Sequence, residues 1–164
     1  MNTPSDIMPR HVVAIDPGVN GGIAWSSPNG DRTAPMPATL GDFRELLFNI
    51  LLEQSFFISE ARVVCYIEEL PKFVRAIPSS AVFVMARNYG QLEGVLTAFQ
   101  VPVVHVRPQT WQKALGLGTS KGGSKTAWKN KLKARAQDLF PEEHVTLKTA
   151  DALLIYHAAK HRLI

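Results

Sequence analysis

The sequence predicts an α/β protein in which a mixed five-stranded β-sheet is flanked by α-helices. Two observations support this fold class. Near the N-terminus, three short strand-like segments follow one another through tight turns, and the rest of the chain alternates helical segments with two apolar strands. With 164 residues, 46% of them hydrophobic, the chain can bury one core and is too short for two. We therefore expect a single domain over residues 1–164, with residues 1–10 as a flexible N-terminal arm.

The first three strands are predicted from apolar runs that end at turn residues. The run VVAI at residues 12–15 stops at Asp16, just before a turn rich in glycine. Strand character resumes over residues 22–27, and Asn29-Gly30 is a strong hairpin signal that leads into a short strand over residues 32–36. These segments are typical of an antiparallel three-stranded meander.

Two helices and a second apolar strand are expected next. Asp42 is a suitable N-cap for a helix through residue 54, in which apolar side chains recur at helical spacing at Phe43, Leu46, Leu47, Ile50 and Leu51. The apolar run over residues 61–70 predicts a strand. Ser79 or Ser80 can cap a long helix ending at Phe99, and the glycines at 90 and 94 each weaken that helix by about 1 kcal/mol, which indicates close packing there.

The last third of the chain is expected to add one strand and two helices. Residues 101–106 form an apolar strand, and residues 107–123 form a loop. Ser124 can cap a helix that ends at Phe140 and carries a row of lysines beside its apolar face: Lys125, Lys129 and Lys133. Residues 148–162 predict a closing helix with an inward stripe at Leu154, Ile155 and Ala158.

Composition excludes several classes of protein. No stretch approaches the roughly 20 apolar residues of a membrane span, and the first ten residues lack the apolar core of a signal peptide, so we expect a cytoplasmic protein. The single cysteine, Cys65, lies in an apolar run and is expected to be a buried hydrophobic residue rather than a nucleophile. A disulfide framework and a structural zinc site are therefore excluded.

The charge distribution favours a nucleic-acid partner. The formal net charge is +4, and residues 107–135 carry several lysines and arginines with no acidic residue. A local positive field of this kind attracts a polyanion more than a small anion.

Three acidic residues are expected where a carboxylate is costly. Asp16 ends the first apolar strand, Glu68 lies near the end of the second, and Asp151 lies in the first turn of the last helix. If the two strands are parallel, Asp16 and Glu68 emerge at the same edge of the sheet. Clustered carboxylates need a cation, and Mg²⁺ prefers oxygen ligands. Each residue also has a simpler interpretation: Asp16 as a turn residue, Glu68 as a solvated strand end, and Asp151 as a charge that complements the helix dipole.

Four motifs resemble those of the RuvC family of Holliday junction resolvases, within the RNase H-like superfamily, in their order and placement along the chain. These motifs are AIDPGVNGGIA, YIEEL, MARNYGQLEGVL and TADALLIYHA. The resemblance covers nearly the whole chain and implies an RNase H-like fold. It implies that Asp16, Glu68 and Asp151 are catalytic metal ligands. It further implies a dimeric endonuclease of bacterial or bacteriophage type that uses Mg²⁺, with Mn²⁺ as a substitute, to make paired nicks in branched DNA during recombination and repair.

One position departs from the family pattern. A further acidic residue or histidine usually lies three positions before the final aspartate, and here that residue is Lys148. Four interpretations stay open. The second metal is bound more weakly; Glu69 or His144 substitutes for the missing ligand; the Lys148 ammonium acts catalytically against the scissile phosphate; or catalysis is lost while junction binding remains.

The resemblance also gives the basic segment a role. Family members hold the DNA backbone with lysines in this region, and the candidates here are Lys113, Lys121, Lys125 and Lys129. The alternative for the lysine row is a solvated helix face. Phe73, in the loop after the second carboxylate, is a candidate for stacking on an unpaired base, and core packing is an equal alternative.

Three rival functions remain at this stage. The DPGVNGG turn also resembles a phosphate loop of the actin and hexokinase ATPases, but those proteins close two such domains around a nucleotide. An RNA-processing nuclease of the YqgF type would share the fold and the acidic ligands. A junction-binding protein with weakened or lost catalysis would share everything except the reaction.

Overall fold

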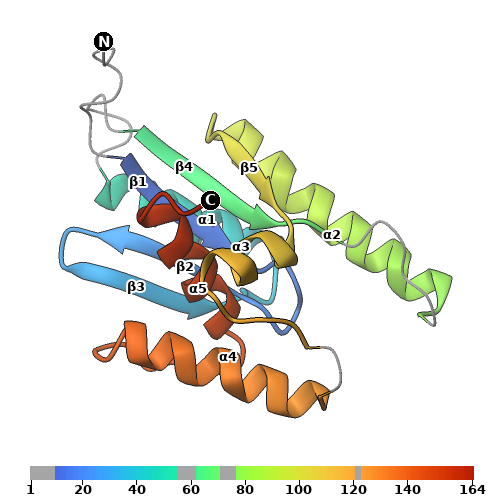
Figure 1. The fold of residues 1–164 in the computed structure, drawn as a ribbon. Helices are drawn as coiled ribbons and strands as arrows, with labels where there is room; N and C mark the ends of the chain where they lie inside the picture. The colour runs from blue at the N-terminus through green and yellow to red at the C-terminus, as the bar shows by residue number, and fades with distance from the viewer. Residues whose placement is uncertain (1–9, 55–61, 71–76, 121–122) are drawn as a thin grey trace, which may run out of the picture.

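The computed structural model describes residues 10–54, 62–70, 77–120 and 123–164. Five strands and five helices occupy these ranges (Figure 1). The strands are β1 (Arg10–Ile15), β2 (Gly22–Ser27), β3 (Gly30–Pro35), β4 (Arg62–Glu68) and β5 (Val103–Val106). The helices are α1 (Leu40–Glu53), α2 (Ser79–Ala98), α3 (Pro108–Ala114), α4 (Lys125–Leu139) and α5 (Ala150–Lys160).

The five strands form one mixed sheet in the order β3-β2-β1-β4-β5, which confirms the predicted fold class. β1 pairs with β2, and β2 with β3, in antiparallel fashion, so the expected meander is present. β4 runs parallel to both β1 and β5. The register sets Ile15 opposite Ile67. Asp16 and Glu68 therefore emerge at the same edge of the sheet, as the sequence predicts for parallel strands.

Helices cover both faces of the sheet, because alternate residues of the central strand are buried on opposite sides. Val13 and Ile15 pack in a core with α1 and α2, whereas Val12 and Ala14 pack in a second core with α3, α4 and α5. In Figure 1, α5 crosses one face over β1 and β2, and α1 lies behind the sheet. The result is a three-layer arrangement in which the sheet is the middle layer.

Helix α5 is buried on nearly all sides, beyond the single inward stripe expected from its sequence. Its buried residues run without interruption from Ala150 to Tyr156 and include Ala158 and Ala159. A helix that is apolar all round belongs inside a core. Asp151 is the one charged residue in this buried run, and it is only 5% exposed.

Two predicted helix caps are wrong. Helix α1 begins at Leu40, and its N-cap is Thr39, whose Oγ1 accepts from the Asp42 backbone N–H at 3.1 Å and donates to the Asp42 carboxylate at 2.7 Å. Asp42 lies in the first turn, where a carboxylate also favours the helix dipole. Helix α2 begins at Ser79 after Pro78, with no side-chain cap. By contrast, Ser124 caps α4 as predicted, accepting from the Ala127 N–H at 3.0 Å.

The segment predicted as the loop 107–123 contains helix α3, and its central side chain, Trp111, is fully buried. Pro108 at the first helical position is the local signal that favours this short helix. Within the described part of the chain, Gly90 and Gly94 do not pack closely, because a Cβ added at either residue would meet nothing within 4 Å.

Other expectations have mixed outcomes. Cys65 is buried, as predicted. Arg10 already belongs to β1, so the expected arm of residues 1–10 is too long by one residue, and residues 1–9, Phe73 and Lys121 lie outside the described residues. Among the described helices, none is both long and apolar enough to cross a membrane.

Candidate active site

Asp16 is the first residue after β1, and the chain folds back tightly on it. The Asp16 N–H donates to the Gly22 carbonyl at 2.9 Å, and the Gly18 N–H donates to the Asp16 carboxylate at 3.3 Å. A Cβ at Gly21 would lie 2.2 Å from the Asp16 carbonyl oxygen, and one at Gly22 would lie 2.8 Å from the Lys148 carbonyl oxygen. These glycines therefore serve close contacts within the protein.

Glu68 ends β4, next to Asp16 at the same sheet edge. The indole N–H of Trp111 donates to the Glu68 carboxylate at 2.8 Å. Since Trp111 is fully buried in the core beneath α5, it gives Glu68 a fixed partner. A hydrogen bond to a carboxylate is stronger than one between neutral groups, so Trp111 sets the orientation of Glu68.

Asp151 enters from the first turn of α5 and completes an acidic cluster. One of its oxygens accepts from the ammonium of Lys129, which comes from α4. The other oxygen, Oδ1, is buried without a hydrogen-bond partner among the described residues. A buried carboxylate oxygen without a partner is costly, and such atoms often mark a site for an ion or water.

The three carboxylates are close enough to alter one another's ionisation. Burial, followed by repulsion from Asp151, raises the pKa of Asp16 to about 6. Burial, followed by repulsion from Asp16, raises the pKa of Glu68 to about 7, although the Trp111 hydrogen bond opposes the shift. Desolvation lowers the pKa of Lys129, but its neighbours Asp151, Asp16 and Glu68 raise it by more, so the ammonium stays charged. The cluster carries more negative charge than one lysine balances.

These shifts predict that stability falls as pH rises. Asp16 and Glu68 bind protons more tightly in the folded state than in the unfolded state, so ionising them between about pH 4 and pH 7 favours unfolding. Asp16→Asn should remove the Asp16 share, on the order of 3 kcal/mol at about pH 8, and should stabilise the protein there. Urea unfolding in EDTA at about pH 5 and pH 8 measures this. Equal pH slopes for the variant and the wild type would contradict it.

A groove of about 750 Å³ lies next to the cluster and carries a positive rim. Asp16 lines it together with Lys125, Lys129 and Lys148. Lys148 makes no ion pair with any described residue, whereas Lys129 contacts Asp151 directly. The N-terminal part of the lysine row on α4, Lys125 and Lys129, therefore faces the carboxylates.

The structure separates the other candidates from this groove. Lys113 is exposed at the end of α3 and lines neither hollow beside the carboxylates. Glu69 pairs with Arg107 at 3.2 Å on the rim of the neighbouring hollow, which also contains Glu68. His144 is exposed and lines neither hollow.

The donor set fits a hard divalent cation in its chemistry. Such an ion would offset the charge of the three carboxylates, two of which have raised pKa values. It would also give the unpaired Oδ1 of Asp151 a partner. In the conformation described, however, no three His, Cys, Asp or Glu side chains of the described ranges lie close enough together to hold an ion. Trp111 and Lys129 each hold one of the carboxylates by a direct contact.

The sequence does not predict that Trp111 and Lys129 contact the carboxylates. Trp111 falls in the segment predicted as a loop, and nothing in its spacing points to Glu68. Lys129 was expected to contact DNA phosphates, and its pairing with Asp151 depends on how α4 packs against α5. The lysine row beside the apolar face of α4 was the only available signal.

The sheet order, with helices on both faces and acidic residues at the carboxyl edge of β1 and β4, defines an RNase H-like fold. Within that class the chain has a RuvC-like fold. It is similar to Thermus thermophilus RuvC in complex with a Holliday junction substrate, with 17% identity, a TM-score of 0.58 and 94% of each chain covered. A second Thermus thermophilus RuvC structure is 15% identical over 93% of each chain, with a TM-score of 0.56. No protein-family model and no curated protein matches the sequence.

Proposed function

We propose that this protein is a metal-dependent endonuclease that resolves four-way DNA junctions by hydrolysing phosphodiester bonds. The observation that carries the proposal is the meeting of Asp16, Glu68 and Asp151 beside a lysine-lined groove. The RuvC-like fold adds support, since one of the similar structures is a RuvC complex with a Holliday junction substrate.

Each carboxylate has a distinct task in this proposal. Mg²⁺ or Mn²⁺ bound by Asp16, Glu68 and Asp151 would lower the pKa of an attacking water and stabilise the leaving oxygen. Asp151 offers its unpaired Oδ1, and Trp111 keeps one oxygen of Glu68 oriented. Asp16 lies at a turn whose glycines fix its backbone.

The lysines divide into two roles. Lys125 and Lys148 line the groove and contact no carboxylate of the described ranges, which suits them to phosphate oxygens of the DNA backbone. Lys129 offsets the charge of Asp151 through a direct ion pair. Among the interpretations of Lys148, a contact with phosphate fits its exposed position best. Lys113, Lys121 and Phe73 stay predictions as DNA contacts.

The test is a cleavage assay on three substrates. Purified protein is incubated with a synthetic four-way junction, a linear duplex and a structured RNA, each with Mg²⁺, Mn²⁺ or EDTA. We expect paired cuts in the junction only, and only with a divalent cation. Preferential cleavage of the RNA would overturn the proposal in favour of an RNA-processing nuclease.

A second candidate is a junction-binding protein with weakened or lost catalysis. The Lys129 pair with Asp151 favours it, because this ammonium neutralises one ligand of the cluster. Tight junction binding without cuts in either metal would establish this alternative.

We further propose that the protein acts as a homodimer, because paired incisions need two sites. Helix α2 supports this part of the proposal. Only Leu92 and Leu96 of α2 are buried, and Figure 1 shows the helix extending beyond the sheet. Its outward face carries Phe83, which is 68% exposed, and the two glycines at 90 and 94, spaced at helical intervals. Small residues at this spacing let two helices approach closely.

Gly94→Leu should convert the dimer to a monomer. Leucine favours a helix by about 1 kcal/mol relative to glycine, and a Cβ at this position meets no described atom within 4 Å, so the isolated monomer should not be weakened. Sedimentation velocity measures the change, and Gly94→Ala is the matched control that should retain more dimer. A Gly94→Leu dimer as tight as the wild type would place the interface elsewhere.

A further inference from the structure

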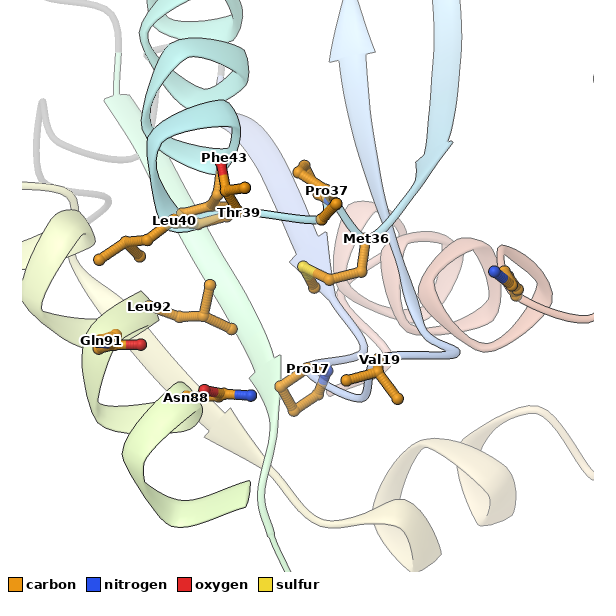
Figure 2. A pocket seen from close by; sticks show the side chains of 12 residues that line it. Pro17, Val19, Met36, Pro37, Thr39, Leu40, Phe43, Asn88, Gln91 and Leu92 are labelled. Atoms are coloured by element: carbon orange, nitrogen blue, oxygen red, sulfur yellow. The ribbon is translucent and has the colours of Figure 1, made fainter. Parts of the chain in front are cut away.

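A second cavity, of about 300 Å³, adjoins the groove beside the carboxylates. It lies between the β1–β2 turn, the connection from β3 to α1, and one side of α2 (Figure 2). Four residues line both the cavity and the groove: Pro17, Val19, Asn88 and Lys148. The cavity is thus contiguous with the site where the proposed function places a DNA strand. Its volume is at the lower end of the range for small-ligand pockets, roughly 300–1,000 Å³.

The walls of this cavity are apolar on several sides. Pro17 and Met36 face it from the turn and from the end of the β-meander, and Leu92 faces it from α2 (Figure 2). A flat apolar group could lie against such side chains, as bases do against apolar walls in pockets that receive them.

Two amide side chains supply the polar groups. Asn88 and Gln91, one helical turn apart on α2, point toward the cavity in Figure 2. Neither side-chain amide forms a hydrogen bond with a residue of the described ranges. Each amide has a donor and an acceptor at one end, which is the pattern that reads the edge of a nucleobase, adenine in particular.

The charge of the lining points to the same ligand class. Among the described residues that line the cavity, Lys148 is the only charged one. The absence of a carboxylate disfavours a cationic ligand, and the apolar walls disfavour a bare anion. A neutral planar base inside, with its own phosphate near the Lys148 ammonium, matches both features.

We propose that this cavity receives an unpaired nucleobase from the strand to be cut, and that Asn88 and Gln91 read its edge. This inference rests on the proposed function. A junction suits it, because the energetic cost of moving a base into a pocket is least where the base is already unpaired. The two amides would then give the enzyme a preference for one base next to the incision.

The test compares junctions that carry each of the four bases, or an abasic residue, at positions flanking the incision. Single-turnover rates should differ by about tenfold or more with base identity at one position in the wild type. Asn88→Ala and Gln91→Ala should flatten this preference, and the abasic junction should react alike with wild type and variants. Asn49→Ala, which removes an exposed amide on α1, is the control and should keep the wild-type preference.

A binding measurement without cleavage separates this inference from the proposed function. A 2-aminopurine at the preferred position should change its fluorescence when the junction binds in EDTA, and Asn88→Ala with Gln91→Ala should lose most of that change. A junction-cutting enzyme whose base preference is unaltered in both variants overturns the inference and leaves the function standing. A protein that binds no junction overturns both.

Discussion

Asp16→Asn is expected to lower the rate of junction cleavage by at least about 10³-fold, since a metal site contributes several kcal/mol and about 4 kcal/mol corresponds to that factor. Asparagine keeps the shape of the side chain and its contact with the Gly18 N–H but removes the charge that a cation needs. Single-turnover cleavage of a labelled junction with Mn²⁺ or Mg²⁺ measures the loss.

The same variant should bind the junction at least as tightly as the wild type, because it repels the phosphate backbone less. Asp138→Asn, which removes an exposed carboxylate from α4, is the matched control and should cleave normally. Substantial residual cleavage by Asp16→Asn, within about tenfold of the wild type, would exclude Asp16 as a metal ligand.

Lys129→Met is expected to destabilise the metal-free protein by about 2 kcal/mol at neutral pH and above. The substitution leaves the buried Asp151 carboxylate, whose side chain is 8% exposed, without its cationic partner. Because the Lys129 side chain is 36% exposed, the loss should be smaller than for a fully buried pair. Urea unfolding in EDTA measures it.

A double-mutant cycle makes this prediction specific to the pair. Adding Asp151→Asn to Lys129→Met should restore much of the lost stability, since the unpaired charge is then gone. Mn²⁺ should stabilise Lys129→Met more than the wild type, as the ion takes over the role of the ammonium. Lys148→Met, which lines the same groove without an ion pair, should leave stability unchanged. A Lys129→Met protein as stable as the wild type in EDTA would refute the prediction.

The sheet was predictable because strand signals are local. Apolar runs, the Asn29-Gly30 turn and the position of Asp16 each depend on a few neighbouring residues, and the parallel pairing of β1 with β4 follows from the intervening helix. Helix α3 was missed because seven residues are too few to show helical periodicity. The cap of α1 was misplaced because Thr39 and Asp42 are both capable caps, and geometry alone decides between them.

The sequence predicts the three carboxylates of the candidate site, but it does not predict the side chains that contact them. Asp16, Glu68 and Asp151 each end or begin an element, and the topology brings such ends together. Lys129 and Trp111 reach the cluster through the packing of α4 and α3, which no pattern within the chain specifies. Lys148, although only three residues from Asp151, precedes α5, in a segment where its N–H donates to Thr146 Oγ1 at 3.2 Å. Its side chain lines the groove.

The deep burial of α5 has a consequence for how quickly parts of the site can rearrange. For a helix enclosed on nearly all sides, we expect amide hydrogens to exchange only when the whole domain opens, and we therefore expect Asp151 to stay fixed on the timescale of catalysis. Helix α4 buries only Leu132 and Ala136 and can open locally far more often. The acid is therefore the immobile member of the Lys129–Asp151 pair, and the lysine is the member able to move aside within a single turnover.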